Sequence, residues 1–152
     1  SPFNAFLILQ GIETLSLRMQ RAMDNARELA LWLGSQKQVE RVCYPGLKTH
    51  PSYHNVKKYF PCGAGAVLSF TLRADRSATA TFVDRLQLIT FLTNVGDNKT
   101  LITHPASTTH GQMSEDALKA AGISPGTLRL SVGIEHIDDL KGDLQQALIS
   151  CK

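Results

Sequence analysis

An arginine stands alone in an apolar, strand-like stretch near the end of the chain. In residues 128–134, LRLSVGI, the apolar Leu, Leu, Val and Ile alternate with Arg, Ser and Gly. One set should therefore face a core, and Arg129 should lie on the opposite face. A guanidinium is seldom buried without a partner, and its planar fork fits the two oxygens of a carboxylate. We expect Arg129 to be solvated, to pair with an acid such as Glu135 or Asp138, or to stay open for an anionic ligand.

The other residues capable of polar chemistry form no pattern of this kind. A zinc site can be imagined from four histidines and a cysteine, but their spacing matches no metal motif, so no metal is expected. These residues are His50, His54, His104, His110 and Cys62. The cysteines are widely spaced, odd in number and without a CxxC pair, which favours reduced thiols in a cytoplasmic protein. They are Cys43, Cys62 and Cys151.

The composition is that of one globular domain. The chain has 152 residues, of which 43% are hydrophobic and 19% charged, and this is enough to bury an ordinary core. Its net charge of +3 comes from scattered basic residues, which argues against a nucleic-acid partner. The longest apolar runs, such as AFLIL, fall far short of the roughly 20 residues of a membrane-spanning helix. We therefore expect no membrane partner, and no signal peptide is recognisable.

A long helical pattern opens the chain. Apolar residues recur at three- and four-residue spacing from Asn4 to about Gly34, and Gly11 weakens the middle of this run. A bend or two consecutive helices are therefore expected over the first 34 residues. Because the chain begins SPFNAF, without an initiator Met, it resembles a piece of a longer protein.

Strands and helices alternate through the rest of the chain. Period-two patterns and turn residues predict the strands, and three- or four-residue spacing predicts the helices. The first predicted strand lies within 39–47 and ends at the Pro45-Gly46 turn, and the second lies within 61–73, after glycines that mark a bend. The other predicted strands are 90–96 and 128–134, and the predicted helices are 50–60, 76–89, 114–122 and 137–150. Residues 97–114 show no periodicity and are expected to form a long loop. The order favours a single α+β domain, a two-layer sandwich with a small, mostly antiparallel sheet and helices on one face.

Five stretches together resemble a known family. In chain order they are SPFNAFLILQGIETLSLRMQRAMDNA, YPGL, GAGAVLSF, NVGDNKTLITHPASTTHGQ and LRLSVGIEHIDDLKGDLQQAL. They are similar to the C-terminal portion of the Cys/Met-metabolism enzymes that use pyridoxal 5′-phosphate (PLP). The resemblance implies that residues 1–152 are a single C-terminal domain of a larger fold-type I PLP enzyme, with residues 1–34 as the helical segment leading into it.

The stretch from Asn94 to Gln112 resembles the O-acetylhomoserine sulfhydrylases most. Lyases and cystathionine synthases more often look like Ser-Leu-Gly followed by an acid, where this chain has Asn94-Val95-Gly96 and Lys99. Cystathionine γ-synthase and methionine γ-lyase remain alternatives within the family. A stand-alone interaction module that never meets PLP is the alternative from another class.

The resemblance also implies roles for particular residues. The arginine of the RLSVG motif, Arg129, would bind the carboxylate of the amino-acid substrate, and Asn94 would lie beside it. Alternatively, Asn94 simply favours the turn before Gly96. His104 and His110 would be hydrogen-bond partners that organise their loop, not general bases.

The family's PLP-binding residues belong to a large N-terminal domain that this sequence lacks. The resemblance therefore implies that this chain has no PLP site or activity alone. Its partners would be that domain, O-acetylhomoserine and sulfide or a thiol, in a cytoplasmic homo-oligomer. An apolar docking patch is expected from the first helix and the HPAS loop at residues 104–107.

Overall fold

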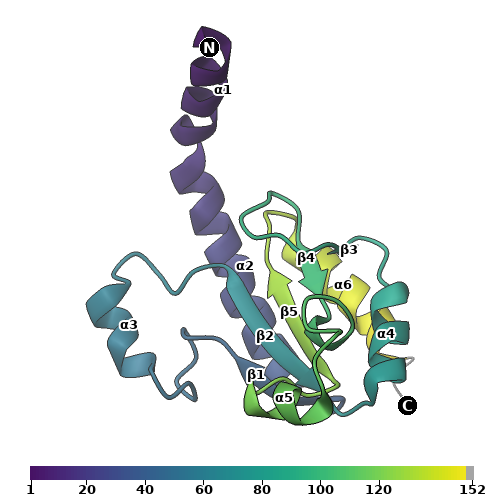
Figure 1. Ribbon diagram of the computed structural model, residues 1–152. Helices are drawn as coiled ribbons and strands as arrows, with labels where there is room; N and C mark the ends of the chain where they lie inside the picture. Colours follow the sequence, from purple (N-terminus) through teal and green to yellow (C-terminus); the bar gives the residue numbers. More distant parts are fainter. Residues whose placement is uncertain (150–152) are drawn as a thin grey trace.

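The computed structural model describes residues 1–149, in which five strands form one mixed sheet with helices packed on it (Figure 1). The strands stand in the order β1-β2-β5-β4-β3. Neighbouring strands are antiparallel except β3 and β4, which run parallel. The strands are β1 Val39–Cys43, β2 Val67–Leu72, β3 Thr90–Phe91, β4 Leu101–Thr103 and β5 Thr127–Ser131. The expected α+β fold with a small, mostly antiparallel sheet is confirmed.

Two consecutive helices, α1 (Pro2–Glu13) and α2 (Leu15–Gly34), begin the chain. The expected interruption is present, but it lies at Thr14 and not at Gly11. Helix α2 packs against the sheet, whereas α1 buries none of its residues and projects away from it (Figure 1). Helix α1 therefore contributes nothing to the core of this domain.

The apolar surface of α1 is the exposed patch expected from the sequence. Its exposed large apolar side chains are Phe3, Phe6, Leu7, Ile8, Leu9 and Ile12. The other half of that expectation is wrong, because in the HPAS loop His104 and Ala106 are each only 1% exposed. Both side chains pack inward, so this loop adds little apolar surface.

The stretch 97–114, expected to be a loop, contains a strand of the sheet. Strand β4 pairs with β5 on one side and β3 on the other, and all three of its residues are buried. A single 3₁₀ turn, Pro105–Ser107, follows it. The prediction failed because three residues are too few for a periodic pattern, and β4 depends on partners distant in sequence.

The core lies between the sheet and three helices. Helices α2, α4 (Arg76–Asp84) and α6 (Ile137–Leu148) cover one face of the sheet, and Phe82 of α4 packs edge-on against Phe70 of β2. Fully buried leucines of β5 and of α2 and α6 fill the space between these layers. They are Leu29, Leu33, Leu128, Leu130, Leu140, Leu144 and Leu148.

Two short helices, α3 (Tyr53–Tyr59) and α5 (Glu115–Ala120), lie where helices were predicted. Ser114 caps α5, since its hydroxyl accepts a hydrogen bond from the Ala117 N–H. Two strands are shorter than expected. The first, β3, ends at Phe91, and β5 ends at Ser131, which leaves Ile134, expected to face the core, 37% exposed.

Candidate functional site

Arg129 and Asn94, 35 residues apart, lie together in the structure. Arg129 is in β5, paired with Ser69 of β2 on one side and Thr103 of β4 on the other. Its neighbours Leu128 and Leu130 face the core, so the arginine lies on the opposite, polar face, as the alternation predicts. Its Nη2 donates a hydrogen bond to the carbonyl oxygen of Asn94 at 3.4 Å.

The acids proposed as alternative partners of Arg129 are occupied elsewhere. The carboxylate of Glu135 accepts hydrogen bonds from Thr100, and Asp138 lies 3.8 Å from the imidazole of His136. Among the side chains that the structure describes, Arg129 forms no recorded ion pair with a carboxylate. The alternative in which Arg129 pairs with Glu135 or Asp138 is therefore wrong, and the guanidinium remains able to bind an anion.

Asn94 begins a turn and also contacts the arginine. Its side-chain oxygen accepts a hydrogen bond from the Val95 N–H at 2.9 Å. Gly96 follows with φ near +87°, a conformation that favours glycine. The N–H of Gly96 donates to the Ser131 hydroxyl at 3.2 Å, which joins the turn to the end of β5. Both alternatives for Asn94 are thus compatible with the geometry: it shapes the turn and lies beside Arg129.

Sequence reasoning missed Thr100 and its hydrogen bonds to Glu135. Thr100 is fully buried immediately before β4, and its N–H and hydroxyl donate to the Glu135 carboxylate at 2.6 and 2.8 Å. The only signal in the sequence was that Glu135 directly follows the predicted strand 128–134. We considered this acid as a partner of Arg129 instead.

His104 is a buried hydrogen-bond bridge. Its Nε2 lies 2.8 Å from the Pro125 carbonyl oxygen and its Nδ1 2.8 Å from the Ser107 hydroxyl. Burial lowers the pKa of His104 below its ordinary value of 6.5; the Pro125 contact partly offsets this effect, and Arg76 adds to it. The imidazole therefore connects two loops, as expected. The His110 ring contacts the Thr109 hydroxyl at 2.8 Å, and its main-chain N–H donates to the Pro105 carbonyl oxygen at 2.9 Å.

We expect the stability of the domain to fall as the pH drops through about 6.5. With the pKa of His104 lowered by folding, the unfolded chain binds more protons below 6.5, so the free energy of unfolding decreases from there towards the lower folded-state pKa. His104→Gln should flatten this dependence. Urea unfolding of both proteins at about pH 7.5 and about pH 5.5 measures it. Equal losses of stability in the two proteins would contradict the prediction.

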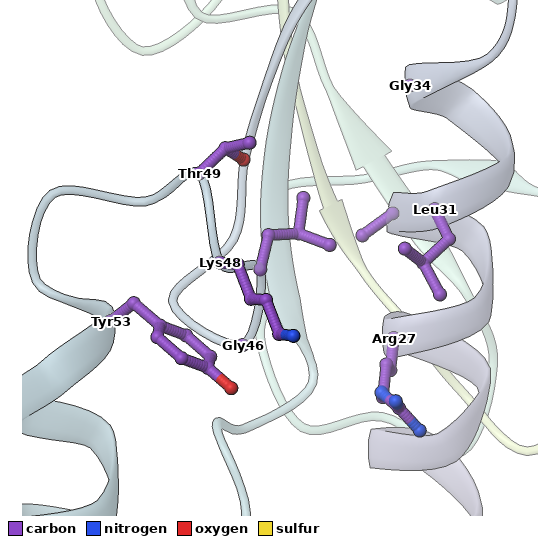
Figure 2. Close-up of a pocket in the computed structure, with 9 residues that line it drawn as sticks. Arg27, Leu31, Gly34, Gly46, Lys48, Thr49 and Tyr53 are labelled. Carbon is purple, nitrogen blue, oxygen red and sulfur yellow. The ribbon is translucent and has the colours of Figure 1, made fainter.

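A separate groove of about 420 Å³ lies between α2 and residues 46–53. Figure 2 shows Arg27 and Leu31 on the helix, with Lys48 and Tyr53 on the facing segment. None of the residues that line it belongs to the Arg129 site. Among the described residues, no group of three His, Cys, Asp or Glu side chains could hold a metal ion.

The thiols of Cys43 and Cys62 are free and exposed, and Cys151 lies outside the described residues. None of the helices in residues 1–149 is both long and apolar enough to cross a membrane.

Several curated proteins are similar to the chain over nearly its whole length. O-acetyl-L-homoserine sulfhydrylase 1 of Thermus thermophilus is 51% identical over 147 residues, which are 97% of this chain and 35% of that protein. O-acetyl-L-homoserine sulfhydrylase of Leptospira meyeri is 47% identical, and O-succinylhomoserine sulfhydrylase of Pseudomonas aeruginosa 45% identical. Each alignment covers 97% of this chain and 34% or 36% of the relative. The chain thus spans about a third of these relatives.

Solved structures share the fold. A Campylobacter jejuni protein described as an O-acetylhomoserine (thiol)-lyase, which holds a pyridoxyl-lysine, matches with a TM-score of 0.88 and 43% identity over 98% of this chain and 35% of that one. Cystathionine γ-synthase of Xanthomonas oryzae matches with a TM-score of 0.86 and 42% identity over 99% of this chain and 39% of that one. The sequence model of the family described as Cys/Met metabolism PLP-dependent enzymes matches residues 1–149, so the chain belongs to this family.

Proposed function

We propose that this chain is the C-terminal, substrate-binding domain of an O-acetylhomoserine sulfhydrylase. The observation that carries the proposal is the open guanidinium of Arg129 beside Asn94, within a sequence about half identical to named sulfhydrylases. In the proposed reaction, sulfide or a thiol forms a C–S bond at Cγ of O-acetylhomoserine. The bond between Cγ and the ester oxygen breaks, that oxygen keeps the electron pair, and acetate leaves. The product is homocysteine or methionine.

Arg129 would hold the carboxylate of the amino acid. Two parallel N–H···O hydrogen bonds from a planar guanidinium fix a carboxylate in orientation as well as in position. In the PLP family the cofactor supplies the electron sink, and the protein must present one particular bond of the substrate to it. When the carboxylate is held in place, the substrate cannot rotate away from the orientation that the reaction requires. Asn94, whose carbonyl oxygen already contacts Arg129, would border the bound carboxylate.

The groove of Figure 2 does not fit PLP itself. The groove of Figure 2 contains a lysine and a tyrosine, but Lys48 is exposed, and the C-terminal turn of α2 at Gly34 lines one end. Carbonyl groups at the end of a helix disfavour a phosphate. We therefore assign the cofactor to the rest of the full-length protein.

The activity is tested with the full-length protein and O-acetylhomoserine. Sulfide as acceptor should give homocysteine, whereas cysteine should give little cystathionine. The second candidate, cystathionine γ-synthase, has support from the similar Xanthomonas structure. It predicts the opposite preference for the acceptor. Elimination without any acceptor would instead indicate a γ-lyase.

The exposed apolar surface of α1 supports packing against the remainder of the protein or a second copy. Free thiols at Cys43 and Cys62 are consistent with a reducing compartment such as the cytoplasm. A stand-alone interaction module is the remaining alternative. An upstream reading frame without a PLP-binding domain would favour that alternative over a sulfhydrylase.

The 152-residue chain by itself should neither bind PLP nor turn over O-acetylhomoserine. Because the cofactor is assigned to the rest of the full-length protein, the visible spectrum of a mixture should equal the sum of its components. Difference spectroscopy across a PLP titration, with equilibrium dialysis as a check, measures this. A saturable new absorbance band would contradict the assignment of the cofactor to another domain.

A further inference from the structure

Both carboxylate oxygens of Glu135 accept hydrogen bonds from one residue, Thr100. Oε1 accepts from the Thr100 N–H at 2.6 Å and Oε2 from the Thr100 hydroxyl at 2.8 Å. Hydrogen bonds to a charged acceptor are shorter and stronger than neutral ones. Because Thr100 is fully buried, loss of the acceptor would leave its polar groups without a partner. The pair therefore fixes the start of β4 to the residues that follow β5.

The same threonine is fixed from a third direction. Its hydroxyl oxygen accepts a hydrogen bond from the buried Gly133 N–H at 2.9 Å, while the Ile134 N–H donates to the Asn98 carbonyl oxygen at 2.9 Å. Loop 94–100 and the end of β5 thus contact each other through main chain and side chain together.

Helix α2 holds this arrangement from the other side. The buried Asn25 donates through its Nδ2 to the carbonyl oxygens of Gly133 and Glu135, at 3.0 and 2.9 Å. Arg18 of the same helix donates to the side-chain oxygen of Asn98 at 3.3 Å. The carboxylate of Glu135 is therefore placed by its own backbone, and it does not turn towards Arg129.

The opposite end of loop 94–100 carries Asn94, whose carbonyl oxygen accepts from Arg129. We propose that Glu135, acting through Thr100, is a positioning residue for the Arg129 carboxylate site. By fixing loop 94–100 it holds the Asn94 carbonyl where it orients the guanidinium fork. By giving both its oxygens to Thr100 it leaves the positive charge of Arg129 free for the substrate. This inference rests on the proposed function only in taking Arg129 as the carboxylate site.

The test compares how tightly two ligands bind to the full-length protein that carries its cofactor. L-Norvaline carries a carboxylate, and butylamine is the same molecule without it, so the ratio of their dissociation constants reports the carboxylate site. Calorimetric titration should give wild type a clear preference for norvaline. Glu135→Gln and Thr100→Val should each weaken norvaline binding by about tenfold, on the order of one charge-assisted hydrogen bond, and leave butylamine binding unchanged. The double variant should be no weaker than either single one, and Thr100→Ser should bind like wild type.

Asp143→Asn is the matched control. Asp143 is a buried acid that, like Glu135, accepts main-chain hydrogen bonds, here from Gln87, Leu88 and Ile89, and none of its recorded hydrogen bonds reaches loop 94–100. Its loss should lower stability without changing the norvaline preference. An unchanged preference in Glu135→Gln and Thr100→Val, or an equal loss in Asp143→Asn, would overturn the inference while the proposed function stands. A wild type that binds both ligands alike would remove the carboxylate site and the inference together.

Discussion

Replacing Arg129 with alanine in the full-length enzyme should lower kcat/KM for O-acetylhomoserine by roughly 30- to 1,000-fold. The range corresponds to about 2 to 4 kcal/mol for a charge-assisted, bidentate contact with a carboxylate in a partly dry site. Arg129→Lys keeps the charge but loses the fork, so its loss should be smaller and affect the same step. Steady-state kinetics of both variants, at several concentrations of sulfide, measure the effect.

Two controls separate this role from a general defect. The cofactor spectrum should be unchanged in both variants, because Arg129 is assigned to the substrate. Arg27→Ala removes another arginine, exposed on α2 and lining the groove of Figure 2, and should keep near-normal kcat/KM. Near-normal activity of Arg129→Ala, or loss of PLP from it, would show that the carboxylate assignment is wrong.

Local patterns predicted most elements of this fold. The helical periodicity before Gly34, the cap at Ser114 and the alternation around Arg129 each depend on neighbours within a few residues, and the structure bears them out. Strand β4 was missed because the residues that stabilise it as a strand lie elsewhere in the sequence. Leu101–Thr103 is a strand because β5 and β3 provide hydrogen-bond partners on both sides.

The site was predictable only in part. Alternation placed Arg129 on the polar face of a strand, but its proximity to Asn94 came from the family resemblance, since 35 residues separate the two in sequence. The partner of Glu135 was not predicted, for a related reason. Charge attraction suggested Arg129 only as one alternative, whereas Asn25 holds the Glu135 backbone and the carboxylate satisfies the buried Thr100. A requirement to satisfy buried groups outweighs attraction between partly solvated charges.

Gly133→Ala should destabilise the domain by about 1 to 3 kcal/mol or more, the range for an added group in a filled space. A β-carbon at this position would overlap the Asn98 carbonyl oxygen and lie 2.6 Å from the Lys99 carbonyl carbon. Both are backbone atoms, so loop 94–100 would have to move as a unit. That shift would also stretch the contacts of Gly133 with Thr100 and Asn25.

Gly142→Ala provides a control of opposite sign. Gly142 lies inside α6, and a β-carbon added to it would meet no atom of the surrounding structure within 4 Å. Alanine there should stabilise the helix by roughly 0.5 to 1 kcal/mol, because glycine loses more backbone entropy on folding. Urea unfolding of the 152-residue chain should thus move the two midpoints in opposite directions from wild type. If Gly133→Ala kept the wild-type midpoint, the close approach of loop 94–100 to the end of β5, on which the proposed role of Glu135 depends, would be refuted.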